Sequence, residues 1–209
     1  MSDSDRFNQA IQRFDAAHRE DPNLFDGVPA QLLYAQRMTQ WLDRLYADAS
    51  EPLRLAARCQ HIRRWMIPRS RYPMTRSGYH QWRTALYSFH AQTAGQILRD
   101  VGYDDATIAA VVSLLRKEKL KSNPDMQALE DVICLVFLEH ELALFAPRQH
   151  EQKVIDILRR TWKKMSPLGH AAAMQLQLPP NLRSLIAQAL RLPPQDGPER
   201  SAAAGSDRS

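Results

Sequence analysis

Apolar residues recur along most of the chain with the three-and-four spacing of an amphipathic α-helix. Phe7, Ile11 and Phe14 form one such stripe, and similar stripes follow in later segments. Proline and glycine separate the segments, for example at Pro68 and Gly102. No strand-like alternation and no internal repeat stand out. The pattern therefore predicts an all-α fold, a single helical bundle of about eight or nine helices.

Helix start and stop signals set approximate bounds for these segments. Ser50 and Asn123 are typical N-caps, and each precedes a proline suited to a first helical turn. After residue 190 the chain has too few apolar side chains to build a core. We therefore expect one helical domain over residues 1–190 and a disordered tail over 191–209. The expected helices cover residues 5–21, 29–48, 50–67, 77–101, 103–120, 124–145, 150–166, 167–178 and 179–190.

The composition fits a single domain and indicates in which cellular compartment the protein is expected. The chain has 209 residues, 44% of them hydrophobic, with only 7 glycines, which favours helices. Cys59 and Cys134 lie far apart, so the sequence predicts no disulfide framework. The first residues lack the apolar stretch of a secretory signal, and the longest apolar run, 132–138, is too short to span a bilayer. We expect a cytoplasmic protein without a membrane partner.

Positive charge is concentrated in the middle of the chain. Residues 54–121 hold thirteen basic and four acidic residues, a charge of +9, so the remainder of the +5 total is −4. Arginine, which binds phosphate through two parallel hydrogen bonds, prevails over lysine near His61. The alternative is a solvated face whose arginine stems cover the core. The segment predicts an anion pocket for a small phosphate-bearing ligand or RNA, with candidates Arg58, Arg64, Arg69, Arg71, Arg83 and Lys117.

Four titratable residues lie on apolar helix faces. His61 and His90 each have apolar neighbours one turn away, and Glu130 and Asp131 interrupt a helix that is otherwise apolar nearly all round. Taken singly, each histidine is explained by a hydrogen-bonded core position, and each acid by the positive end of its helix. Together, imidazole and carboxylate are a typical transition-metal set. The sequence thus predicts a divalent metal ion on His61, His90 and Asp131, with Glu130 as a fourth ligand or as a group that supports the ligands.

The order of these residues resembles the HD-domain metal phosphohydrolases. His61 matches the first histidine of that family, His90 stands 29 positions later where a His-Asp doublet begins, and Asp131 stands 41 positions further, where the last aspartate falls. The doublet here reads His90-Ala91, so its aspartate is missing. A second alignment leaves the doublet out and keeps the same three residues. The resemblance implies an HD-domain-like fold and phosphohydrolase chemistry.

Over roughly residues 5–190 the chain is also similar to a family of bacterial and fungal proteins that share a domain of unknown function. The similarity is carried by AARCQHIRRWMIPRSRYP, WRTALYSFHA, LEDVICLVFLEHEL and TWKKMSPLGH. Some members carry a glutamyl-tRNA synthetase label, but this chain lacks the strand pattern and nucleotide-binding motifs of such an enzyme. Two functions follow as expectations: a metal-dependent hydrolase of a phosphate-bearing or nucleotide-like substrate, and a non-catalytic nucleotide- or RNA-binding module.

Overall fold

Helices make up nearly all of the regular structure in the computed structural model, which describes residues 2–118 and 123–191. The α-helices are α1 (Asp3–Arg19), α2 (Ala30–Leu45), α3 (Glu51–Cys59), α4 (Arg76–Val101), α5 (Asp105–Arg116), α6 (Pro124–Val136), α7 (Leu142–Phe145), α8 (Glu151–Trp162), α9 (Pro167–Met174) and α10 (Pro180–Leu190). Three short 3-10 helices are η1 (Arg64–Met66), η2 (Arg69–Arg71) and η4 (Ala146–Arg148), and η3 (Phe137–Glu141) is a π-helical turn. Strands β1 (Leu24–Phe25) and β2 (Val28–Pro29) form one small antiparallel hairpin.

The all-α class predicted from the sequence is confirmed, with ten α-helices in the described ranges. Among those helices, none is both long and apolar enough to cross a membrane. The predicted disordered tail over 191–209 lies outside the described residues except for Arg191, the residue after α10. Residues 119 and 120 of the predicted 103–120 helix lie outside them as well.

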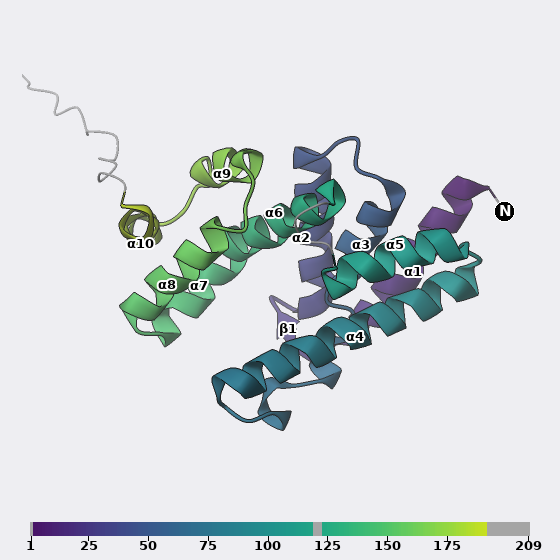
Figure 1. Ribbon diagram of the computed structural model, residues 1–209, viewed down its shortest axis with the longest axis horizontal. Helices are drawn as coiled ribbons and strands as arrows, with labels where there is room; N and C mark the ends of the chain where they lie inside the picture. The colour runs from purple at the N-terminus through teal and green to yellow at the C-terminus, as the bar shows by residue number, and fades with distance from the viewer. Residues whose placement is uncertain (1, 119–122, 192–209) are drawn as a thin grey trace, which may run out of the picture.

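The central core is built from the helices that the apolar stripes predicted. Phe14 of α1, Met38 of α2, Leu55 of α3, Leu98 of α4 and Leu129 of α6 are all fully buried in one cluster. Helix α2 packs against α1, α3 and α6, and α4 lies along α5. Helix α6 runs through the π-helical turn into α7, and α8 lies beside this rod (Figure 1). Helix α6 therefore stands between the N-terminal helices and the C-terminal ones.

Local capping chemistry fixes the starts of the two helices that matter most for the site. The Ser50 hydroxyl accepts from the Leu53 backbone N–H at 3.2 Å, and the Asn123 side chain accepts from the Asp125 N–H at 2.9 Å. Both N-caps are as predicted. Each satisfies a backbone donor that the first helical turn leaves without a partner. Helices α3 and α6 are therefore fixed at the ends from which they run toward the site.

Helix α3 ends earlier than the predicted 50–67 segment, at Cys59. The chain continues in tight turns, where Ile62 N–H donates to the Cys59 carbonyl at 3.0 Å and Arg63 adopts a left-handed φ of 50°. His61 thus stands in a turn after α3 instead of on the helix, and η1 follows at once.

The loop after η1 is fixed on the start of α4. Arg69 donates to the carbonyls of Tyr72 at 2.9 Å and Pro73 at 2.7 Å, and the Trp82 indole donates to the Ile67 carbonyl at 2.9 Å. A Cβ atom on Gly78 would lie only 2.1 Å from the Pro73 carbonyl oxygen, so this close approach requires glycine. The loop therefore forms a defined wall beside α4.

Candidate functional site

A cavity of about 280 Å³ opens between the turn after α3 and helices α4, α6 and α8. The π-helical turn contributes Phe137 and Glu141 to its lining. Such turns are rare and are frequent at functional sites. A second cavity of about 230 Å³ shares Tyr34, His61, Arg64 and Glu141 with the first, so the two adjoin. These four side chains therefore stand between the two cavities.

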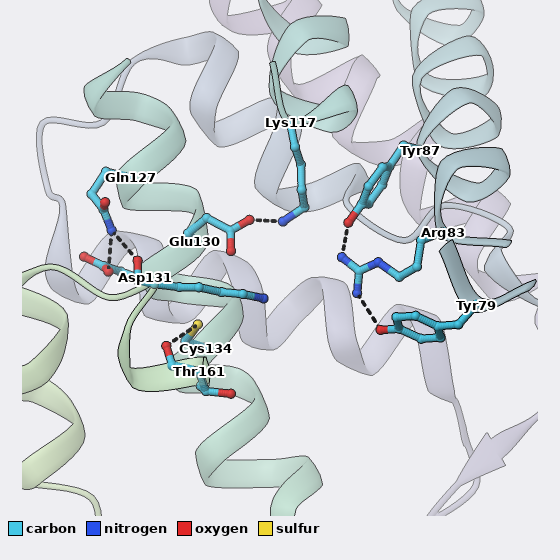
Figure 2. A network of polar contacts seen from close by, with 10 residues as sticks. Tyr79, Arg83, Tyr87, Lys117, Gln127, Glu130, Asp131, Cys134 and Thr161 are labelled. Carbon is cyan, nitrogen blue, oxygen red and sulfur yellow. Dashed lines mark hydrogen bonds and ion pairs between the residues drawn. The ribbon is translucent and has the colours of Figure 1, made fainter. Parts of the chain in front are cut away.

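Two arginines line the cavity and are held by aromatic side chains. The Arg64 guanidinium lies 4.8 Å from the centre of the Trp82 ring. Arg83 donates to the Tyr79 hydroxyl at 3.3 Å and also to the Tyr87 hydroxyl, as Figure 2 shows. Neither arginine pairs with a carboxylate among the described residues. Aromatic faces and hydroxyl groups orient these cations but do not neutralise them.

Lys117 and Glu130 form an ion pair at the cavity wall, with side chains only 11% and 8% exposed. Lys117 ends α5 in a left-handed conformation, with φ of 59°, which turns its side chain back toward α6. Burial, Arg83 and Lys164 lower the pKa of Lys117 to about 7, whereas the contact with Glu130 favours its charged form. The pair thus places one basic and one acidic group together at the cavity wall.

The structure brings His61 and His90 to the same cavity. Their ring centres are 5.9 Å apart, and the His61 ring stacks on Tyr34 at 4.3 Å. His90 Nδ1 lies 2.8 Å from the Ile62 carbonyl oxygen. Burial lowers the pKa of His90 to about 4 and holds the pKa of His61 well below its usual 6.5. Both rings are therefore neutral at pH 7.

Asp131 does not line the cavity that contains His61 and His90. It is fully buried on another side of α6, where it accepts from the Ser166 N–H at 2.7 Å, the Ser166 hydroxyl, the Tyr46 hydroxyl at 2.5 Å and Gln127 at 3.0 Å. A Cβ atom on Gly169 of α9 would lie 2.8 Å from its carboxyl carbon. Asp131 thus attaches the start of α9 to α6.

The predicted metal set of His61, His90 and Asp131 is therefore not assembled. Successive residues of an α-helix point about 100° apart, so Glu130 faces Lys117 while Asp131 faces away, as Figure 2 shows. Within residues 2–118 and 123–191, no three His, Cys, Asp or Glu side chains are grouped to hold a metal ion. Glu130, expected either as a fourth ligand or as a group that supports the ligands, forms an ion pair with Lys117.

The predicted anion-binding residues divide into two groups. Arg64, Arg83 and Lys117 line the cavity, but Arg58, Arg69 and Arg71 do not. Arg58 donates to both carboxylate oxygens of Asp15 at 2.7 and 2.8 Å. The other two donate to backbone carbonyls of their own loop. These three arginines stabilise the fold.

Lys164 also lines the cavity and was not among the predicted site residues. In the sequence it follows α8 in TWKKMS, where a lysine is explained by the negative end of its helix. Only the packing of α8 beside α6 and α7 brings it to the cavity, and no local signal marks this position.

Neutral buried histidines make stability depend on pH. Burial lowers the pKa of both His18 and His90 from 6.5 to about 4, so the unfolded chain binds protons there at pH 5 and the folded chain does not. Stability is complete above pH 6.5 and falls as the pH drops toward 4. We expect a loss of about 1–2 kcal/mol for each histidine between pH 6.5 and 5, measured by urea unfolding.

Two variants separate this effect from the titration of carboxylates. Gln at position 18 can still donate to the Arg58 carbonyl, which His18 Nε2 contacts at 2.9 Å, but it cannot take up a proton. His18→Gln should flatten the pH dependence, while His80→Gln at an exposed position should leave it unchanged. An equal pH slope in wild type and His18→Gln would contradict the assignment of a neutral His18.

Comparisons with known proteins identify a family for most of the chain. A family model described as a domain of unknown function, DUF4202, matches residues 8–186. The match covers every residue of the cavity lining. No curated protein and no solved structure matches the chain. The resemblance to HD-domain phosphohydrolases stays a prediction, as does the HD-domain-like arrangement of the helices.

Proposed function

The chain belongs to the DUF4202 family, a domain of unknown function, and we propose from its cavity that it binds a small phosphate-bearing ligand. The observation that carries this proposal is the pair of partly buried guanidinium groups of Arg64 and Arg83, which form no salt bridge with a carboxylate among the described residues. A charge withdrawn from water is costly unless it is paired. A bound anion supplies the missing partner.

The charge balance of the cavity fits a phosphate monoester. Four basic side chains stand against two acidic ones, and the neutral histidines add nothing. The excess is two positive charges when Lys117, whose pKa is lowered to about 7, is protonated. A phosphate monoester carries about −1.5 to −2 charge at pH 7. Guanidinium groups also match the geometry of phosphate oxygens. The cations are Arg64, Arg83, Lys117 and Lys164, and the acids are Glu130 and Glu141.

The same geometry favours a small ligand and favours binding over hydrolysis. The cations line a cavity of about 280 Å³, near the lower end of the volumes typical of small-molecule sites. A nucleic acid would be expected to contact an extended basic surface. The hydrolase expectation depended on Asp131 as a metal ligand, and this carboxylate instead accepts hydrogen bonds from Ser166 and Tyr46.

Inorganic phosphate titrated into the protein tests the proposal. We expect saturable binding by calorimetry or ³¹P NMR, weakened by salt. Arg64→Gln and Arg83→Gln should each weaken binding about tenfold to hundredfold, because a hydrogen bond to a charged group is lost. Arg99→Gln, at an exposed position on α4, is the matched control and should bind as wild type does. Unchanged affinity in the Arg64→Gln/Arg83→Gln double variant would refute the proposal.

A further inference from the structure

We infer that the ligand carries, besides its phosphate, a hydroxyl group that donates a hydrogen bond to His90 Nε2. The cavity would then select a hydroxylated phosphate ester, such as a sugar phosphate, over a phosphate ester without hydroxyl groups. This inference rests on the proposed function and specifies the class of ligand. It starts from the tautomer of one buried histidine.

The Ile62 carbonyl fixes that tautomer. A carbonyl oxygen only accepts hydrogen bonds, so His90 Nδ1, at 2.8 Å from it, carries the hydrogen. Burial lowers the pKa of His90 to about 4, and the ring therefore holds a single proton at pH 7. His90 Nε2 is consequently a lone-pair acceptor, and the ring offers no second N–H to a phosphate.

This acceptor is buried and has no hydrogen-bond partner among the described residues. His90 is 2% exposed and lines the cavity. Gln60, 4% exposed in the same lining, has a buried Oε1 atom without a partner as well. Buried acceptors are nearly always satisfied by protein or by ordered water, so these two atoms need donors that the described residues do not supply, and a ligand in the cavity can bring them. His18 also has an unpaired ring nitrogen, but it does not line this cavity.

The charges around His90 decide which donor fits. A phosphate dianion has only acceptor oxygens, so it cannot satisfy Nε2, and it belongs with Arg64 and Arg83. An ammonium group could donate to Nε2, but the cavity already has an excess of positive charge. A hydroxyl group donates without adding charge. The cavity volume of about 280 Å³ leaves room for more than the phosphate group.

Two phosphate monoesters test the inference, ribose 5-phosphate with hydroxyl groups and butyl phosphate without them. We expect wild type to prefer ribose 5-phosphate by about tenfold, the value of one hydrogen bond. The His90→Asn variant keeps a donor toward the Ile62 carbonyl, because Asn Nδ2 takes the place of Nδ1, but it has no counterpart of Nε2. It should lose the preference while its affinity for butyl phosphate stays within about twofold of wild type. His18→Gln, away from the cavity, should keep the preference.

The outcomes separate the inference from the proposed function. If wild type binds both esters equally, or if His90→Asn keeps the preference, the inference fails and phosphate binding stands. If neither ester binds, both fail. Should His90→Asn not fold, ¹⁵N NMR of the wild-type histidine rings decides. The Nε2 resonance of His90 should shift with ribose 5-phosphate and not with butyl phosphate, and a doubly protonated ring in the complex would overturn the inference.

Discussion

The Asp131→Ala variant is expected to lose about 3–5 kcal/mol of its free energy of unfolding. Asp131 is 0% exposed, and its carboxylate accepts from the Ser166 N–H at 2.7 Å and the Tyr46 hydroxyl at 2.5 Å. Alanine leaves these donors buried without partners and opens a gap against α9. Urea denaturation at pH 7 measures the loss, and the start of α9 should be the first region to lose its amide protection.

Two controls separate this structural role from metal binding. The first control is Asp156→Ala, because Asp156 is exposed on α8 and pairs with Arg159 at 3.3 Å. Removing this surface carboxylate should lower the free energy of unfolding by less than about 1 kcal/mol. A metal chelator should leave the stability of wild type unchanged, because the partners of Asp131 are protein donors. Equal stability of Asp131→Ala and Asp156→Ala, or a wild type destabilised by chelator to the level of Asp131→Ala, would contradict this account.

Arg58→Met should cost about 3–5 kcal/mol of stability without weakening phosphate binding in the folded protein. Arg58 and Asp15 have side chains only 12% and 13% exposed, and the guanidinium contacts both carboxylate oxygens. Methionine fills much of the same space but leaves the Asp15 carboxylate buried and unpaired. Because Arg58 does not line the cavity, phosphate affinity should equal that of wild type.

A double variant tests whether the unpaired charge causes the loss. In Asp15→Leu/Arg58→Met both charges are absent, and most of the stability should return, since apolar replacements for a buried ion pair are often neutral or better. Arg54→Met is the matched surface control, because the Arg54–Asp43 pair is 33% and 51% exposed. An Arg58→Met variant that stays fully stable but loses phosphate binding would restore Arg58 to the site.

The fold class and the helix starts were predictable because their signals are local. Apolar stripes and caps such as Ser50 and Asn123 act over a few residues, and the structure keeps them. The end of α3 was not predictable from the same signals. His61 lies seven positions before Pro68, in a stretch whose apolar periodicity continues as in a helix. The structure shows that the helix has ended at Cys59 and that Arg63 adopts a left-handed turn conformation.

The candidate site was predictable in part. The charge asymmetry of residues 54–121 pointed to the segment that supplies Arg64, Arg83 and Lys117. Which arginines enter the cavity depends on partners distant in sequence, as Arg58 and Asp15 illustrate with 43 positions between them. The sequence shows that Glu130 and Asp131 point about 100° apart on their helix. It does not show how that helix is rotated about its own axis, and so which of the two carboxylates faces the cavity. That rotation places Asp131 at the start of α9, on a different side of α6 from Glu130 and outside the cavity lining.

The close contact between Gly78 and the Pro73 carbonyl makes one position informative about related chains. Any other side chain at position 78 would displace this carbonyl, since its Cβ would fall 2.1 Å from the oxygen. The loop that Arg69 holds would then take another path, and Trp82, which contacts both this loop and Arg64, would lose its position. In an alignment of the family, glycine at this position is therefore expected to mark chains that share the cavity wall, even though Gly78 itself does not line the cavity.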